Sequence, residues 1–150
     1  MQVKTHPSMN VLYSSHKTSV NQLHEYVGTV ARDLYAEAAR QHLLVTGPVY
    51  WSYYGMDGQP DTIFTLEIAI PVSGIAEMEN GFLFKEFPSF KCLYTLHSGA
   101  WNQLPQTYGS LMKEVQQKDL QMNGVFREVY YNIDFSRDEN NLTEVQVGIV

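Results

Sequence analysis

The chain has 150 residues, of which 44% are hydrophobic and 17% charged, and its formal net charge is −6. This length and composition indicate one globular domain with its own core. The scattered Lys and Arg residues exclude a nucleic-acid surface and an anionic-membrane binder, which both need clustered positive charge. A single cysteine, Cys92, excludes an intramolecular disulfide and a thiolate metal cluster.

Other common site types are missing as well. The five His residues lack the spacing of a zinc site, and neither a phosphate-binding Gly loop nor a nucleophile elbow occurs. We therefore expect no metal and no cofactor. The first residues show no apolar signal region and no run has the length of a membrane span, so we expect a cytoplasmic protein.

The first half of the chain predicts a β-α-β-β unit. Residues 10–15 read as a strand. Residues 20–42 read as a helix, because apolar residues recur at spacings of three and four. Strands at 49–54 and 63–71 flank a turn rich in Gly and Pro. The connector at 72–89 is expected to be a linker whose aromatic residues cover an open edge of the core.

The same order of elements then begins again. Residues 91–97 predict a strand, and a helix follows from Ala100 with its apolar face marked by Leu104, Tyr108 and Leu111. Two more strands are expected at 125–132 and 142–150. The second half thus has the plan of the first.

The two halves align residue by residue. Leu12, Tyr13, His16, Asn21, Gln22 and Leu23 recur as Leu93, Tyr94, His97, Asn102, Gln103 and Leu104, each 81 positions later. The helix positions Val27, Val30 and Leu34 match Tyr108, Leu111 and Val115 at the same offset. After the helix the offset is 77, where Gly47, Tyr53 and Tyr54 meet Gly124, Tyr130 and Tyr131. The loss of four positions is close to one helical turn of about 3.6 residues.

This duplication predicts the fold. We expect one α+β domain over 1–150, with repeat one at about 10–71 and repeat two at about 90–150. The repeats are expected to pack about a pseudo-two-fold axis, with antiparallel sheets and a central cleft. We expect the last strands to align at an offset of 79, so that Ile70 matches Ile149.

The candidate site centres on the strand at 126–132. Alternation places Phe126, Glu128 and Tyr130 on one face. Taken alone, Glu128 is either an exposed residue without a role or a desolvated anion that selects cations in an aromatic cleft. The repeat adds Trp51 and Tyr53 on the facing wall, with Glu67 and Trp101 as further neighbours. The alternative is that Trp51 and the tyrosines are only sheet core.

The chain resembles the GyrI-like small-molecule-binding domains, which also serve as effector-binding domains of bacterial AraC-type and MerR-type transcription regulators. The resemblance covers nearly the whole chain. Its motifs lie at His97–Leu104 with Tyr108, at Phe126–Tyr130 and at Val145–Ile149. Trp101 stands where the family usually has Tyr. The resemblance implies a duplicated β-α-β-β fold with a central cleft, in which Glu128 pairs with cationic aromatic ligands.

Three functions follow as hypotheses. The first is a stand-alone sensor or sequestering domain for amphipathic, cationic small molecules, as in multidrug-binding regulators. The second is a hydrolase of strained electrophilic natural products that uses Glu128 with Tyr130 or Tyr53 to activate water. The third is a protein-interaction module that acts on gyrase or on a separate regulator. Because the helix-turn-helix of the regulators is missing, we expect no direct DNA binding, and exposed sheet edges make a homodimer a further expectation.

Overall fold

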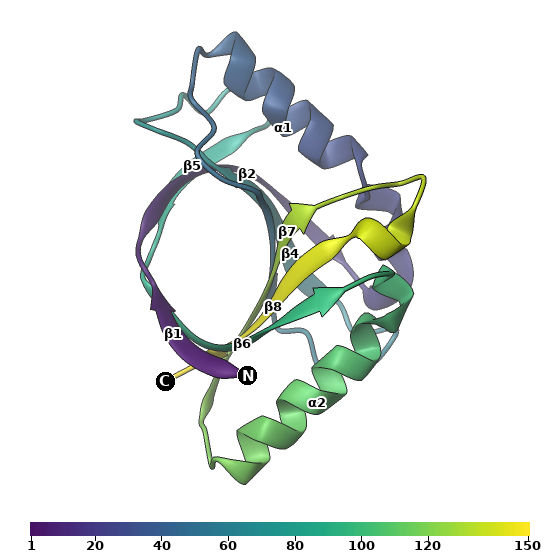
Figure 1. Cartoon of the computed structure of the whole chain (residues 1–150). Coiled ribbons are helices and arrows are strands. Elements are labelled where there is room, and N and C mark those ends of the chain that lie inside the picture. Colours follow the sequence, from purple (N-terminus) through teal and green to yellow (C-terminus); the bar gives the residue numbers. More distant parts are fainter.

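The computed structural model describes all 150 residues and contains one eight-stranded antiparallel sheet in the order β1-β6-β8-β7-β3-β4-β2-β5. The strands are β1 Gln2–His6, β2 Met9–Thr18, β3 Val49–Tyr54, β4 Phe64–Pro71, β5 Leu83–Phe87, β6 Phe90–Ser98, β7 Met122–Asn132 and β8 Leu142–Ile149. The sheet curls into a ring in Figure 1, and the helices α1 (Thr29–Arg40) and α2 (Leu104–Gln117) both lie outside it. None of the helices is long and apolar enough to cross a lipid bilayer.

The strand order is symmetric about its centre, where β3 pairs with β7. Trp51 lies directly opposite Glu128, and these two positions correspond in the two repeats. The pseudo-two-fold axis therefore passes between Trp51 and Glu128. The α+β class, the antiparallel sheet and the duplicated arrangement are confirmed.

Two strands were not expected from the sequence. β5 lies inside the connector that we predicted as a linker, and it pairs with β2, whereas β1 pairs with β6. Each repeat therefore gives its leading strand to the sheet of the other repeat. Both are short edge strands with charged residues, such as Lys4 and Lys85, so apolar alternation does not reveal them.

The expected helix at 20–42 is interrupted. A 3₁₀ helix, η1 (Val20–Tyr26), precedes α1, and Gly28 between them has a φ of 80°, which ends the first helical segment. In the second repeat a shorter 3₁₀ helix, η2 (Trp101–Gln103), runs directly into α2. The four missing residues thus lie before the helix, and the predicted match of Leu34 with Val115 is wrong, because the buried Leu34 and Ala38 correspond to Leu111 and Val115. Helical spacing of apolar residues continues through such a break, so the sequence pattern predicts one helix.

The predicted register of the last strands is wrong by two residues. Ser15 faces Glu67 in the first repeat, and Leu96, its counterpart, faces Glu144 in the second. The offset is therefore 77, and Ile70 matches Val147 rather than Ile149. The apolar alternation of a strand repeats every two residues, so it fits either register equally well.

The helices cover the outer face of the sheet in two separate clusters. Leu34 and Ala38 of α1 pack on β2, β3 and β4, and Leu111 and Val115 of α2 pack on β6 and β8. A third cluster lies on the inner face of the curled sheet and consists of Val11, Tyr50, Ala69, Phe87 and Val129. The outer face over β3 and β7 thus lies between the two helices, where the site is found.

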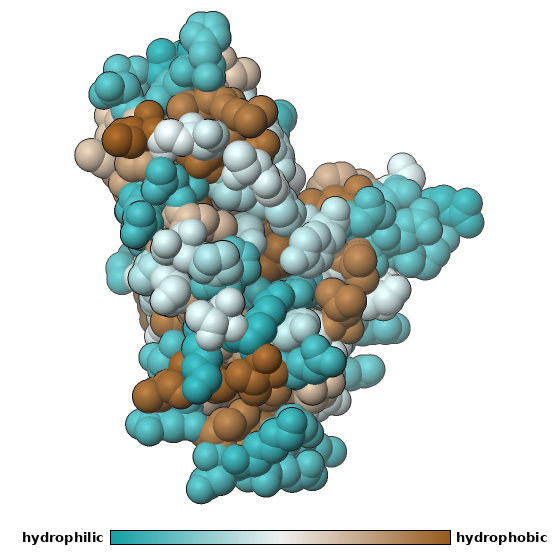
Figure 2. Space-filling view, turned by 60° about the vertical axis from the view of Figure 1, so that its left-hand side comes forward, coloured by the Kyte–Doolittle hydropathy of each residue, from teal (hydrophilic) through white to brown (hydrophobic).

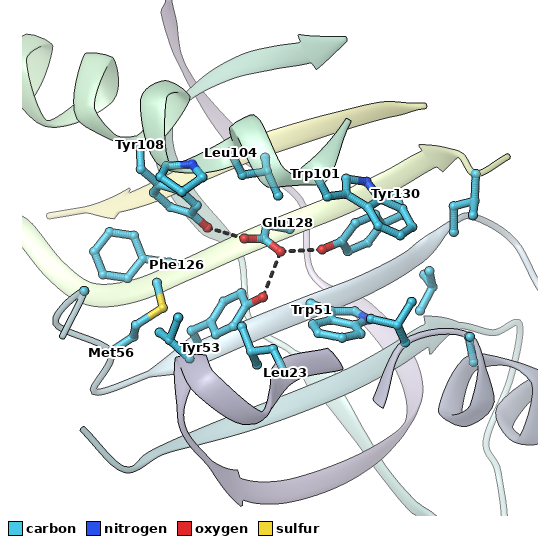
Figure 3. Close-up of a pocket in the computed structure, with 18 of the residues that line it drawn as sticks. Leu23, Trp51, Tyr53, Met56, Trp101, Leu104, Tyr108, Phe126, Glu128 and Tyr130 are labelled. Atoms are coloured by element: carbon cyan, nitrogen blue, oxygen red, sulfur yellow. Dashed lines mark hydrogen bonds between the residues drawn. The ribbon is translucent and has the colours of Figure 1, made fainter. Parts of the chain in front are cut away.

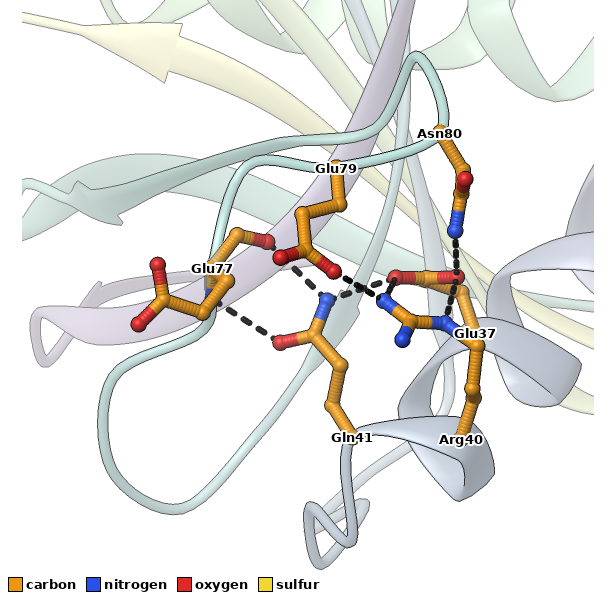
Figure 4. A network of polar contacts seen from close by, with 6 residues as sticks. All are labelled: Glu37, Arg40, Gln41, Glu77, Glu79 and Asn80. Atoms are coloured by element: carbon orange, nitrogen blue, oxygen red, sulfur yellow. Dashed lines mark hydrogen bonds and ion pairs between the residues drawn. The ribbon is translucent and has the colours of Figure 1, made fainter.

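The connector is tied to the end of α1 by a polar network around Glu37 (Figure 4). Arg40 donates to both carboxylate oxygens of Glu37 at 2.9 and 2.6 Å, and Asn80 of the connector donates at 3.1 Å. Arg40 also reaches Glu79 at 2.6 Å. Hydrogen bonds from Arg40 lower the pKa of the buried Glu37 to about 2. This network is present only in the first repeat.

Candidate ligand-binding cleft

A cavity of about 1180 Å³ lies over β3 and β7, between the helices of the two repeats. Of its 25 lining residues, 18 are hydrophobic, so the cavity suits a mainly apolar molecule. Five of the six predicted site residues line it: Trp51, Tyr53, Trp101, Glu128 and Tyr130 (Figure 3). The predicted central cleft is therefore present at the seam of the repeats.

Corresponding residues of the two repeats form opposite walls. The pairs are Val27 with Leu104, Ala31 with Tyr108, Tyr35 with Met112, Val49 with Phe126, Trp51 with Glu128, Tyr53 with Tyr130, and Met56 with Ile133, all 77 positions apart. Strand alternation explains why every second residue of β3 and β7 enters the cavity.

Glu128 is the only carboxylate at the base of the cavity drawn in Figure 3, and its side chain is 4% exposed. Three tyrosines donate to it. Tyr53, at 2.8 Å, and Tyr130 both bind Oε1, and Tyr108 binds Oε2 at 2.6 Å. Both carboxylate oxygens therefore already accept hydrogen bonds from the protein.

Burial controls the charge of this cluster. Desolvation raises the pKa of Glu128, and the hydrogen bonds from the three tyrosines oppose that rise. Burial also raises the pKa of Tyr53, Tyr108 and Tyr130 well above 10.0, so their hydroxyls remain donors at neutral pH. Glu128 takes part in none of the ion pairs of the protein. Its charge is hydrogen-bonded but not neutralised by a cation.

An aromatic wall stands beside the carboxylate. The ring of Tyr130 lies between Trp51 and Trp101, with centroid distances of 5.8 and 5.4 Å. Trp101 donates its Nε1–H to Thr143 at 3.1 Å and packs on Phe135, which comes from the loop between β7 and β8. These contacts fix the orientation of the wall, and the edge-to-face geometry is the one aromatic pairs prefer.

Glu67, the sixth predicted residue, does not line the cavity. It lies opposite Ser52, whose side chain points to the inner face of the sheet, and it binds Lys85 at 2.7 Å. The prediction placed Glu67 on the wrong side of β4, because a continuous apolar strand does not show which face a single acid occupies.

Tyr108 was missed as a site residue. The sequence indicated it as a helix core position and as part of the motif that resembles the GyrI-like domains, but not as a partner of Glu128. Its hydroxyl was the available signal, since a tyrosine at a buried helix position needs a hydrogen-bond partner.

The remaining surface offers fewer sites. No cluster of three or more His, Cys, Asp or Glu side chains is arranged to hold a metal ion. The side of β1, β2 and β5, turned forward in Figure 2, is mostly hydrophilic, with separate hydrophobic patches. Isolated patches of this kind are normal for a folded protein.

The fold and the cleft together define a duplicated small-molecule-binding domain. The chain belongs to the GyrI-like small molecule binding domain family, whose model matches residues 1–150. A search of curated proteins finds no match.

Several solved structures share the fold. The C-terminal domain of EcmrR has a TM-score of 0.85 and 16% identity, over 99% of this chain and 96% of that one. SAV2435 bound to tetraphenylphosphonium has a TM-score of 0.68 and 15% identity, over 99% and 93%. A hydrolase from Listeria innocua has a TM-score of 0.71 and 14% identity, over 99% and 91%.

Proposed function

We propose that the cleft binds an amphipathic, monovalent cation with aromatic or aliphatic bulk, and that the protein uses this binding to sense or sequester such molecules. The observation that carries the proposal is Glu128, a buried carboxylate without a cationic partner in a large apolar cavity. A desolvated charge is costly unless it is paired. A ligand cation in the cleft would supply the missing charge.

The aromatic wall favours the same class of ligand. Trp51, Trp101 and Tyr130 present ring faces and edges to the cavity. A cation over such a ring gains about 0.5–2 kcal/mol, and more when water is excluded. The apolar lining would bury the rest of the molecule.

The tyrosine hydroxyls add a restriction on the cation. Because Tyr53, Tyr108 and Tyr130 already donate to Glu128, an ammonium group with several N–H donors finds about one free acceptor position on the carboxylate. A quaternary ammonium or phosphonium ion has no N–H donors to satisfy, since it interacts through its charge alone. We therefore expect quaternary cations to bind better than primary amines of equal size.

The comparisons support this proposal without deciding it. SAV2435, which shares the fold, carries tetraphenylphosphonium, a quaternary cation. EcmrR is seen in complex with DNA, and this chain spans 56% of that protein. In a regulatory role, the domain would pass the binding signal to a DNA-binding protein in the cytoplasm, acting alone or as a homodimer.

Hydrolysis is the second candidate. A carboxyl group with a raised pKa in an enclosed cavity suits a general base, and the fold occurs in a hydrolase from Listeria innocua. Against it, the tyrosines occupy both oxygens of Glu128, and none of the other lining carboxylates lies at the base of the cavity. Binding is therefore the function that the geometry supports better.

Calorimetric titration with tetraphenylphosphonium and with neutral triphenylphosphine oxide tests the proposal. Glu128→Gln should weaken binding of the cation at least about tenfold, which is 1.4 kcal/mol, and change the neutral ligand little. Glu67→Gln on the other face is the matched control and should leave both affinities unchanged. Equal losses for both ligands would remove the charge role of Glu128. A cleft that binds neither ligand but a stoichiometric protein partner would favour the interaction module.

A further inference from the structure

A row of polar residues crosses the inner face of the sheet, opposite the cleft. Ser52 of β3, Arg127 of β7 and Gln146 of β8 are direct neighbours, because Arg127 pairs with Ser52 on one side and with Gln146 on the other. Directly opposed residues of antiparallel strands point to the same face, with their side chains in contact range. All three side chains are buried.

Each residue of this row has an unsatisfied polar atom. Four buried side-chain atoms in the protein lack a hydrogen-bond partner, and three of them are Arg127 Nε, Ser52 Oγ and Gln146 Oε1. Buried polar groups are nearly always paired, so each exception needs a physical explanation. Arg127 Nε and Ser52 Oγ are donors on adjacent residues, so a single acceptor between them would satisfy both, whereas Gln146 Oε1 is an acceptor and its Nε2 already donates to Glu144.

Arg127 is the most unusual member. It is 2% exposed, forms no ion pair, and its Nε–H has no acceptor within the protein. Its guanidinium carbon lies over two phenylalanine rings, at 4.6 Å from the centroid of Phe87 and 4.0 Å from that of Phe90. The rings hold the group in place but accept none of its hydrogen bonds in the plane, where the donors point.

The charges on this face do not balance. Lys85 pairs with Glu67 and Lys4 pairs with Glu144, both at 2.7 Å, and the two pairs are related by the pseudo-two-fold axis. Arg127 has no such counter-ion. Burial accordingly lowers its pKa, as expected for an uncompensated cation.

The symmetry-related row shows that the fold does not need these polar groups. The counterparts of Ser52, Arg127 and Gln146 are Val129, Tyr50 and Ala69, and these three residues are neighbours in the inner core cluster. The same position of the sheet is thus filled by apolar packing in one repeat. The polar row must have another purpose than closing the sheet.

We propose that Arg127, with Ser52, forms a binding site for a small monovalent anion such as chloride or bromide. The guanidinium and the Ser52 hydroxyl donate to the anion, and the Gln146 amide beside them keeps the hydrogen bond from its Nε2 to Glu144. The anion neutralises the one unpaired charge of the inner face. It is a separate site from the cleft and does not depend on the cleft's ligand.

The burial of Arg127 limits the occupant to a small ion. At 2% exposure, neither a partner protein nor a nucleic acid can reach the guanidinium. A guanidinium is weakly hydrated, and here it lies against two aromatic rings, so a weakly hydrated anion loses little on entry. Bromide and chloride should therefore bind better than fluoride.

Bromide is the direct probe. Crystals of the unmodified protein soaked in sodium bromide should show an anomalous bromine peak within hydrogen-bonding distance of Arg127. This measurement needs no variant and so does not depend on whether a variant folds. If saturating bromide gives no peak at Arg127, the anion site is rejected, and bound water is then the partner of these polar atoms.

Thermal unfolding gives the energetic test. At constant ionic strength, replacing gluconate by chloride should raise the Tm of the protein saturably, by about 3 °C. Arg127→Met should abolish the rise, whereas Tyr50→Phe at the symmetry-related position should retain it. A rise of the same size in Arg127→Met would contradict the proposal.

Discussion

The two repeats have the same skeleton but supply different chemistry to the cleft. The second repeat provides Glu128, Tyr108, Tyr130 and Trp101, and the first provides Trp51 and Tyr53 with aliphatic neighbours. Positions 51 and 128 lie opposite each other on the pseudo-two-fold axis, and one is an indole while the other is a carboxylate. An apolar ring is therefore compatible with this place in the fold. The charge at Glu128 is not needed to build the sheet, which is why we propose that it serves ligand binding.

The inner face shows the same kind of difference. The pair Tyr50 and His6 in one repeat corresponds to Arg127 and Phe87 in the other. In each case an aromatic or imidazole ring of an exchanged edge strand packs on a residue of a central strand. Equivalent positions are therefore in contact in both repeats. The residue types at those positions differ where one repeat contributes to a proposed site.

The largest stability difference between the repeats is expected at Glu37. Glu37→Gln should lower the free energy of unfolding by about 2 kcal/mol, because a buried acceptor of charged hydrogen bonds is lost. Its counterpart Glu114 is partly exposed and pairs only with Lys118, so Glu114→Gln should cost less than about 0.5 kcal/mol. Chemical denaturation of both variants measures the difference.

The pH dependence of the two variants completes this test. The pKa of Glu37 is lowered to about 2, so its stabilisation is present above the ordinary value of 4.5 and is lost as the pH falls from there toward 2. At low pH the free energy of unfolding of Glu37→Gln should therefore approach that of the unmodified protein. Equal costs for Glu37 and Glu114 would mean that the connector network adds nothing to stability.

Much of this architecture was predictable from the sequence. The repeat gave the order of strands and helices, and it brought Trp51, Tyr53 and Tyr130 together with Glu128. What it could not give were features set by backbone pairing. The edge strands β1 and β5 are short and charged, and their exchange between repeats depends on partners that are far apart in sequence.

The site residues that sequence reasoning misplaced have a common physical cause. To place Glu67 and to set the register of β8, one must know which face of the strand points to the helices and which to the inside of the curled sheet. Alternation alone does not decide this when both faces are buried. Tyr108 looked like a core residue because its ring is one, and only its hydroxyl belongs to the site. The orphaned Arg127 likewise requires knowledge of three neighbouring strands.

The next comparison is between the tyrosines of the two repeats. Tyr108 is the only donor to Oε2 of Glu128, whereas Tyr53 shares Oε1 with Tyr130. Tyr108→Phe should raise the pKa of Glu128, because the carboxylate loses a hydrogen bond, and Tyr53→Phe should raise it by less. The cation-binding form is the carboxylate, so affinity for tetraphenylphosphonium increases as the pH rises through this pKa. The midpoint of that titration should shift upward most in Tyr108→Phe, and an unchanged midpoint would contradict the assigned donor.

Glu128 should also leave a trace in the stability of the ligand-free protein. Its folded-state pKa is raised above the ordinary value of 4.5, so the folded state binds the proton more tightly and stability falls as the pH rises through the raised pKa. Glu128→Gln should remove this decline and be more stable by about 1 kcal/mol above that range. Thermal unfolding from pH 4 to pH 9 measures the difference between the two proteins. A variant that is less stable at every pH would show that the carboxylate holds the cleft together instead of straining it.

The smallest expected effect concerns the two ion pairs at the exchanged edge strands, where the repeats should be nearly equal. Lys4→Met and Lys85→Met each remove a half-exposed lysine from a buried carboxylate, so each should cost about 1 kcal/mol. Both lysines lie over a tyrosine ring, Lys4 over Tyr94 and Lys85 over Tyr13. Lys85 binds both oxygens of Glu67, so its loss should cost slightly more. Denaturation of both single variants and of the double variant tests this, and the two losses should add because the pairs lie in different halves of the sheet. A double variant that loses much more than the sum would indicate that the two exchanged strands hold the repeats together as one cooperative unit.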